Sequence, residues 1–341
     1  MTSRERVAKL LRGEHPDRIA VLPGIGDHAG WVNGLTMDII YHDAKKAADA
    51  QVNALREYGY DVVTVQVEPS WPVAEACGCS VTYPPDKCPW ITDRAIKGPA
   101  DVDRMGIPDF MAHAATRTII EATALLREAV GNEVMVAGYM SGPLTFALQL
   151  VAYNDFIIKT RKDPPFTEAL VHKAAQVATA FARALKDAGA EMLVVCEHDL
   201  QLLSPELGEK YLLPGLPEIC SVFEHTILHT CGRVAAHHVQ LADAVCALPH
   251  LDFISFSCDI SIPKMIEIYG NRMGICGNID HIHLLPSGTP EEVQESCRAA
   301  IGEGMKARAF FLSPGCELTI DTPPANVKAF VRSAELYGRY A

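Results

Sequence analysis

The sequence predicts a single (β/α)₈ barrel that occupies residues 1–341, an α/β fold with one domain. Eight short apolar runs alternate with helical segments, which is typical of a parallel sheet covered by helices. The runs are continuously apolar, as strands buried on both faces are. A doubly wound open sheet is the competing fold. The sequence argues against the dinucleotide-binding version of this fold, because no Gly-x-Gly-x-x-Gly follows the first apolar run.

The elements follow one another in regular order after an N-terminal helix at 2–13. The expected strands are 19–23, 61–67, 133–138, 191–196, 223–228, 251–257, 273–277 and 308–312. The expected helical segments are 43–58, 110–129, 144–188, 204–221, 234–246, 262–269, 289–304 and 323–338. Two of these helices open with Ser204-Pro205 and Thr289-Pro290, where a capping hydroxyl precedes a proline suited to the first helical position.

One segment, residues 77–108, interrupts this alternation. Short β-prone stretches lie on either side of Pro84-Pro85-Asp86, which predicts a small inserted hairpin. Cys77-Gly-Cys79 lies at its start and lacks a second cysteine pair, so we interpret these thiols as core residues.

Composition narrows the classes of function. A net charge of −12 argues against nucleic acid as a partner, because phosphate binding needs a basic surface. The uncharged span 134–154 contains Gly138 and Pro143, and it fits a strand, a turn and a helix start better than a membrane helix. The first residues show no signal peptide, and eleven cysteines then suggest a reducing compartment. We therefore expect a cytoplasmic protein with no membrane partner.

The fifth and eighth strands end in potential metal ligands. His229 and Cys231 are two residues apart, so an extended chain presents both on one face. Cys316 follows the eighth strand. One histidine and two cysteines suit Zn²⁺ and leave a fourth position open, as in catalytic zinc sites. Strands five and eight are three steps apart around a barrel, so the loop at Pro314-Gly315 must lean over the mouth.

Other polar residues also follow strands and are expected near the mouth. Glu197 is either a fourth zinc ligand of the resting enzyme, displaced by the substrate, or a helix cap or salt-bridge partner. His28 and Glu68 follow the first two strands and are also candidates for the lining of the pocket. His281-Ile-His283 is a rival metal pair, but no cysteine lies near it and we expect loop surface there. We assign Asp27 and Asn278, with Glu197, to catalysis, and we assign cofactor binding to Tyr139, Ser141 and Asp259.

Several motifs together resemble a known family. They are Leu203-Ser-Pro-Glu206, His229-Thr-Cys231-Gly, Gly277-Asn278-Ile-Asp280, Gly288-Thr-Pro-Glu-Glu292, and Ser313-Pro-Gly-Cys316 followed by Asp321-Thr-Pro323 and Asn326. With these motifs the chain resembles the uroporphyrinogen decarboxylase superfamily, and within it the zinc-dependent, corrinoid-linked methyltransferases. The His-x-Cys with a distant Cys marks that branch, whereas the other segments mark the superfamily.

The resemblance implies a methyltransferase that uses Zn²⁺ and a methylcorrinoid (cobalamin) carried by a partner corrinoid protein. The methyl acceptor would be a thiol such as coenzyme M. In the reverse direction, a methoxy or methylamine substrate would give its methyl group to a Co(I) corrinoid. The sequence leaves open the direction, the small-molecule substrate, and whether the chain forms a homodimer.

Two alternatives remain. The first is decarboxylation of a tetrapyrrole, for which the decarboxylases carry an arginine-rich segment after the first strand. Here no arginine occurs from Ile19 through Leu55, so a substrate with many carboxylates would be poorly bound. The second is a non-catalytic corrinoid-binding scaffold, against which the open coordination position argues.

Overall fold

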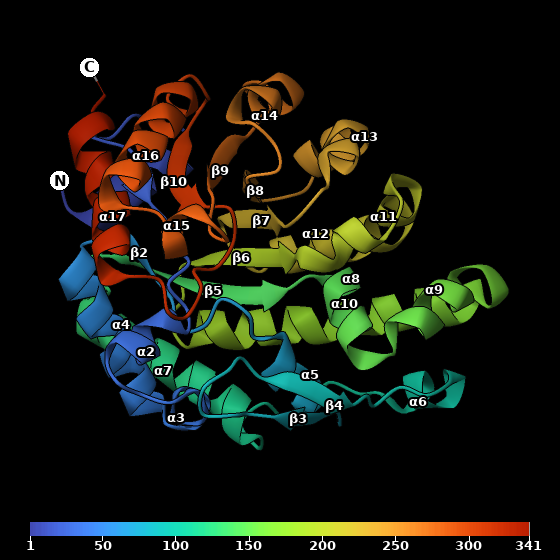
Figure 1. Ribbon diagram of the computed structural model, residues 1–341. Coiled ribbons are helices and arrows are strands. Elements are labelled where there is room, and N and C mark those ends of the chain that lie inside the picture. Colours follow the sequence, from blue (N-terminus) through green and yellow to red (C-terminus); the bar gives the residue numbers. More distant parts are fainter. Residues whose placement is uncertain (341) are drawn as a thin grey trace.

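The computed structural model describes residues 1–340 and confirms the barrel (Figure 1). Eight strands form one sheet in the order β1-β10-β9-β8-β7-β6-β5-β2, and every pair in it is parallel. The strands are β1 (Ala20–Val21), β2 (Val62–Val63), β5 (Met135–Ser141), β6 (Met192–Glu197), β7 (Thr226–Thr230), β8 (Leu251–Phe256), β9 (Gly274–Ile279) and β10 (Phe310–Pro314). Helices surround the sheet, as parallel connections require.

Most helices lie where the sequence places them. They are α1 (Ser3–Leu11), α4 (Ala44–Tyr58), α7 (Ala114–Val130), α8 (Pro143–Leu150), α9 (Tyr153–Lys162), α10 (Pro164–Asp187), α13 (Ala235–Cys246), α14 (Ile262–Tyr269), α16 (Pro290–Gly304) and α17 (Pro324–Tyr337). Thr289 caps α16 in a reciprocal capping box with Glu292. The segment expected as one helix at 204–221 is divided into α11 (Pro205–Leu212) and α12 (Leu216–Cys220), because Pro214 and Pro217 lack the amide hydrogens that a continuous helix needs.

Three short helices near the N-terminus were not expected. They are α2 (His28–Val32), α3 (Met37–His42) and α5 (Ser70–Ala76), and a further one, α15 (Leu284–Ser287), follows β9. Each has seven residues or fewer, which is too short to display a helical repeat of apolar residues. Strand β7 also begins three residues later than expected. His229 therefore lies inside the strand and pairs with Ser255 of β8.

The predicted insertion is a hairpin of β3 (Ser80–Thr82) and β4 (Trp90–Asp93), which pair antiparallel and form a sheet of their own. The short helix α6 (Pro99–Arg104) follows it. Figure 1 shows this hairpin next to α5, apart from the barrel strands. The inserted residues thus leave the order of the barrel strands unchanged.

Strands β1 and β2 form the seam of the barrel and share no strand ladder. The second strand was expected at 61–67 but pairs with β5 over only two residues, and the carboxylate of Asp61 bridges the seam to β1. Its Oδ2 accepts a hydrogen bond from the Val21 amide at 2.8 Å, and its own amide donates to the Val21 carbonyl at 3.1 Å. Arg6 and Arg18 each donate to this buried carboxylate at 2.7 Å.

Replacing Asp61 by alanine should therefore lower the free energy of unfolding by about 3–5 kcal/mol, because two buried guanidinium groups lose a shared counter-ion. Urea denaturation measures this change. Asp49→Ala, which breaks the exposed ion pair with Lys45, is the control and should change stability little. Equal effects of the two substitutions would contradict the assigned role of the seam.

The barrel interior is filled from its N-terminal end. Side chains of α1 (Val7, Leu10 and Leu11) pack with inward-facing strand residues such as Phe253 and Phe311. The carboxyl ends of the strands are therefore left to form the mouth, where barrel enzymes place their active sites. Among residues 1–340, none of the helices is both long and apolar enough to cross a bilayer.

Candidate metal centre

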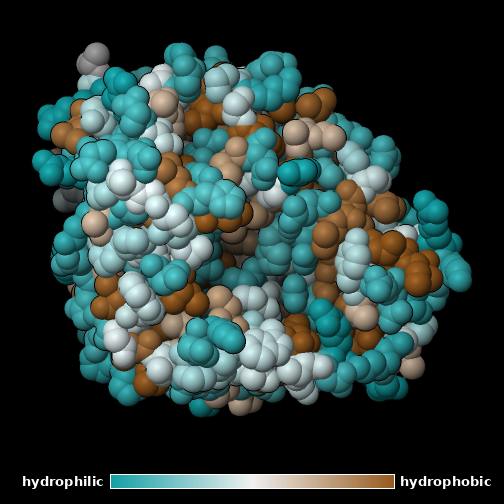
Figure 2. Space-filling model, in the orientation of Figure 1, coloured by the Kyte–Doolittle hydropathy of each residue, from teal (hydrophilic) through white to brown (hydrophobic). Residues whose placement is uncertain are grey.

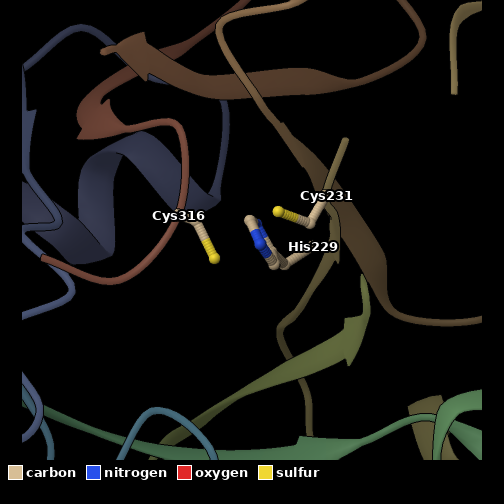
Figure 3. Close-up of side chains that lie close together, drawn as sticks. All are labelled: His229, Cys231 and Cys316. Carbon is tan, nitrogen blue, oxygen red and sulfur yellow. The ribbon is translucent and has the colours of Figure 1, made fainter. Parts of the chain in front are cut away.

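The three predicted ligands converge at the mouth. His229 lies on β7, Cys231 follows it by two residues, and Cys316 follows β10. The ligand atoms of all three lie within 4.8 Å of one another. Figure 3 shows Cys316 reaching toward His229 and Cys231 from the opposite side.

The loop after β10 leans inward as this convergence requires. The Gly315 amide donates to the Ile279 carbonyl at 2.8 Å, and the Leu318 amide donates to the Gly24 carbonyl at 3.1 Å. A Cβ atom at Gly315 would lie only 2.8 Å from the Cys258 amide nitrogen. Glycine is therefore needed at this position for the loop to pack closely against the segment after β8 and to hold Cys316 over the mouth.

His229 is oriented for coordination through one ring nitrogen. Its Nδ1 lies 2.9 Å from Ser255 Oγ, whereas its buried Nε2 has no hydrogen-bond partner among the described residues. An unpaired buried nitrogen is costly unless a ligand fills the position. A partner on the second nitrogen is what metal-binding histidines usually have, since it fixes the tautomer and the ring orientation.

The donor set fits a zinc ion. Zn–S bonds of about 2.3 Å in a tetrahedral site place two sulfurs about 3.8 Å apart, so the ligands need to close by no more than about 1 Å. The hydrogen bond between the two thiols lowers the pKa of Cys231 to about 4 and raises the pKa of Cys316 well above its ordinary value, so the pair favours one thiolate, on Cys231. The thiolate is the form of cysteine that binds metals.

A narrow cavity of about 20 Å³ opens beside these ligands. Its apolar wall comprises Leu22, Val67 and Val194, and Tyr139 also lines it. His229, Cys316 and Glu317 contribute its polar groups, together with Ser255 and Ser313. Figure 2 shows the viewed face hollowed near its centre, with hydrophobic residues deep inside. The cavity thus places an apolar wall and several polar groups next to the ligands.

Among the other predicted site residues, only Tyr139 belongs to the cavity wall. Ser141 donates to Glu68 at 2.9 Å. Asn278 donates to the Ile260 carbonyl at 2.6 Å, and the exposed Asp259 accepts from Ser257 at 3.0 Å. These three side chains satisfy neighbouring groups rather than facing the cavity.

The contacts of Glu197 favour the helix-cap interpretation over the fourth-ligand interpretation. Both carboxylate oxygens accept amide hydrogens at the start of α8, from Leu144 at 3.1 Å and Thr145 at 2.8 Å. A Cβ atom at Gly142 would lie 2.1 Å from its Oε1, so a glycine there makes room for it. Burial raises the pKa of Glu197 to about 7, although these amides oppose the shift.

Two residues near the site were missed or misplaced by the sequence. Glu317 lines the cavity directly after Cys316, and its position after a strand end was a signal that could have identified it. His281 was expected on the loop surface, but it is 9% exposed and its Nδ1 has no partner among residues 1–340. It is buried because the inward-leaning Gly315 covers it: a Cβ there would lie 3.1 Å from that nitrogen.

His28 and Glu68 have other partners. The ring nitrogens of His28 lie 2.9 Å from the Ile320 carbonyl and the Tyr58 hydroxyl. Glu68 Oε2 lies 3.0 Å from His198 Nδ1. Burial alone would raise the pKa of Glu68, but the charge and hydrogen bond of His198 outweigh it and lower the pKa to about 2. Burial would lower the pKa of His198, but Glu68 raises it to about 10.

This pair should stabilise the fold in a limited pH window. The contribution of Glu68 is present above its ordinary pKa of 4.5 and is lost as pH falls toward 2. That of His198 is full below 6.5 and is lost as pH rises toward 10. The difference in free energy of unfolding between the wild type and Glu68→Gln should therefore be largest between pH 4.5 and 6.5. Urea denaturation at several pH values measures it, and a pH-independent difference would contradict the pairing.

Ser255→Ala should weaken zinc binding about 10–100-fold, because His229 loses the partner that orients its ring. Competition with a chromophoric chelator measures the affinity. Ser333→Ala, which removes another buried serine hydroxyl that bonds the Ala329 carbonyl, is the matched control and should leave the affinity unchanged. Equal affinities of Ser255→Ala and the wild type would show that Ser255 does not position the ligand.

A barrel in which a histidine and two cysteines converge at the carboxyl ends of the strands has the architecture of a barrel enzyme, whose active site lies at that mouth. The model of the uroporphyrinogen decarboxylase (URO-D) family matches residues 2–337. The chain therefore belongs to the uroporphyrinogen decarboxylase family.

Curated relatives include methyltransferases and decarboxylases. Methylcobamide:CoM methyltransferase MtaA of Methanosarcina barkeri is 29% identical over 273 residues, which cover 78% of this chain and 77% of the relative. Methylcobamide:CoM methyltransferase MtbA of Methanosarcina acetivorans is 24% identical, with 98% of each chain covered. Uroporphyrinogen decarboxylase of Vibrio cholerae is 23% identical over 85% of this chain and 83% of the relative.

Among solved structures, a methyltransferase from Methanosarcina mazei superposes with a TM-score of 0.88 at 23% identity, covering 99% of both chains. A likeness this extensive supports the fold and the order of its elements.

Proposed function

We propose that this protein is a zinc-dependent methyltransferase that moves a methyl group between a methylated corrinoid and a thiol. The observation that carries the proposal is the convergence of His229, Cys231 and Cys316, with the unpartnered Nε2 of His229 turned to the same place. The names of the relatives MtaA and MtbA support the reaction class.

His229, Cys231 and Cys316 would hold the zinc ion and leave its fourth position to the substrate. When bound, the ion would lower the pKa of a coordinated thiol and so supply a thiolate near neutral pH. Ser255 keeps the His229 ring in place, and the apolar wall of Leu22, Val67 and Val194 limits access of water to the sulfur.

In the transfer itself, the substrate sulfur attacks the methyl carbon of the methylcorrinoid. When bound, the methylcorrinoid would supply the methyl group: the S–CH₃ bond would form as the Co–CH₃ bond breaks, and the electron pair of the broken bond would be left on the corrinoid. A separate corrinoid protein would present the cofactor over the mouth. The reverse transfer, from a methoxy or methylamine donor to Co(I), would use the same residues.

Decarboxylation is the second candidate, favoured by relatives such as the Vibrio cholerae enzyme and by the description of the family model. The loop after β1, residues 23–31, contains no arginine and contributes Gly24 to the cavity wall. A substrate with several carboxylates would lack the guanidinium partners it requires. The absence of arginine from this loop therefore favours methyl transfer.

A thiol panel with methylcobalamin tests the proposal, since the absorbance of the cobalt centre changes when the methyl group leaves. The zinc-loaded protein should methylate at least one thiol, and Co(I) cobalamin with methylated compounds tests the opposite direction. Decarboxylation of a tetrapyrrole by a metal-free sample, without methyl transfer in either direction, would contradict the proposal.

A further inference from the structure

Glu317 places a carboxyl group in the wall of the cavity, directly beside Cys316. Its Oε1 accepts a hydrogen bond from the Asp27 amide at 3.2 Å. Gly26 makes this position possible, because a Cβ atom there would lie 1.8 Å from Oε1. Gly26 also has a φ of +43°, which a residue with a side chain rarely adopts. The backbone of this loop is therefore shaped around the Glu317 carboxyl group.

A second carboxyl group stands next to the first. The Asp27 side chain is 3% exposed, and its Oδ2 accepts from the Tyr41 hydroxyl at 3.3 Å. Its Oδ1 is buried without any hydrogen-bond partner in the described chain. Within residues 1–340, neither Asp27 nor Glu317 has a lysine, arginine or histidine nitrogen within 4.0 Å. Burial and the neighbouring Asp27 raise the pKa of Glu317 well above its ordinary value, and burial raises the pKa of Asp27 to about 6. The two carboxyl groups would therefore both ionise only beside a positive charge, which no basic side chain supplies.

The other residues of the cavity wall also supply no positive charge. The residues that line it include no lysine and no arginine, and Tyr139 presents an aromatic side chain. An anionic group such as the sulfonate of coenzyme M would meet a carboxyl group and no basic side chain. A protonated amine would find a carboxylate partner, and an aromatic ring favours a cation on its face. The unpartnered His229 Nε2 in the same wall marks the end of the cavity where the metal and the sulfur belong.

We propose that the thiol substrate carries a positively charged amine, which the carboxyl group of Glu317 binds. The neighbouring carboxyl group of Asp27 adds negative charge behind Glu317. This inference rests on the proposed function and names the class of its substrate. Glu317 is then a specificity-determining residue that sorts thiols by the charge of the group opposite the sulfur. The relatives MtaA and MtbA are named for coenzyme M, which carries a negatively charged sulfonate. This chain would differ from them in using a thiol with a positively charged group.

Three thiols of equal length test this charge preference: 2-mercaptoethylamine, 2-mercaptoethanol and 2-mercaptoethanesulfonate. With methylcobalamin and the zinc-loaded protein, kcat/KM should decrease in that order, with the amine favoured over the alcohol by about tenfold or more. In Glu317→Gln the ratio of amine to alcohol should approach one while the zinc content is retained. Glu335→Gln, which changes an exposed glutamate on α17, should leave the ratio as in the wild type.

Binding without corrinoid supplies a readout that does not depend on methyl transfer. Calorimetry should show that the zinc-loaded protein binds 2-(methylthio)ethylamine more tightly than 2-(methylthio)ethanesulfonate, and that Glu317→Gln removes the difference. Transfer to the sulfonate at least as fast as to the amine would overturn the inference and leave the proposed function standing. An equal loss for all three thiols in Glu317→Gln, or loss of its zinc, would also overturn it. Preferential amine binding with no methyl transfer to any thiol would instead contradict the proposed function.

Discussion

Cys316→Ser is expected to lower the zinc content from about one ion per chain to nearly none, because the site loses one of its three ligands. We expect kcat/KM for methyl transfer to fall by at least about 10³-fold, which corresponds to about 4 kcal/mol of transition-state stabilisation. The remaining pair of His229 and Cys231 lies on one strand end and cannot enclose an ion without the loop after β10.

Cys246→Ser is the matched control, since this half-buried thiol ends α13 and lies outside the ligand cluster. It should retain both metal and activity. Elemental analysis and the cobalamin absorbance assay measure the two quantities. A Cys316→Ser protein that keeps its zinc would exclude Cys316 from the ligand set.

Removing the metal with a chelator should abolish methyl transfer, to less than about one part in 10³, without unfolding the barrel. The two hydrophobic clusters that fill the barrel and cover it with helices include none of the three ligands. Structural zinc sites differ in this respect, because their domains unfold when the ion leaves.

Circular dichroism should therefore be unchanged in the chelated protein, and added Zn²⁺ should restore the activity. Two results would contradict the catalytic assignment. One is full activity of a sample shown to be free of metal, and the other is unfolding on chelation, which would make the ion structural.

The sequence predicts much of this fold because its signals are local. Continuous apolar runs identify all eight strands, and Thr289-Pro290 identifies the start of α16. The shortness of β2 is not predictable in this way, because Asp61 meets the Val21 amide and the guanidinium groups of Arg6 and Arg18 only in the folded barrel. Those contacts depend on residues remote from the strand itself.

For the candidate site, the sequence likewise predicts the features that depend on local signals and not those that depend on tertiary contacts. His229, Cys231 and Cys316 follow from the rule that barrel strands end at one mouth, and the structure places them together. Side-chain direction does not follow from that rule. Glu197 turns back to the amides of α8, and Asn278 turns to a neighbouring carbonyl. Glu317 faces the cavity, and only its contact with Gly26 and Asp27 explains why.

X-ray absorption at the zinc edge of the purified protein tests the central claim most directly. We predict two sulfur neighbours at about 2.3 Å and at least one nitrogen neighbour at about 2.0 Å, and a third sulfur when a thiol substrate is added. A first shell of only nitrogen and oxygen atoms, or a shell that the thiol leaves unchanged, would contradict the account.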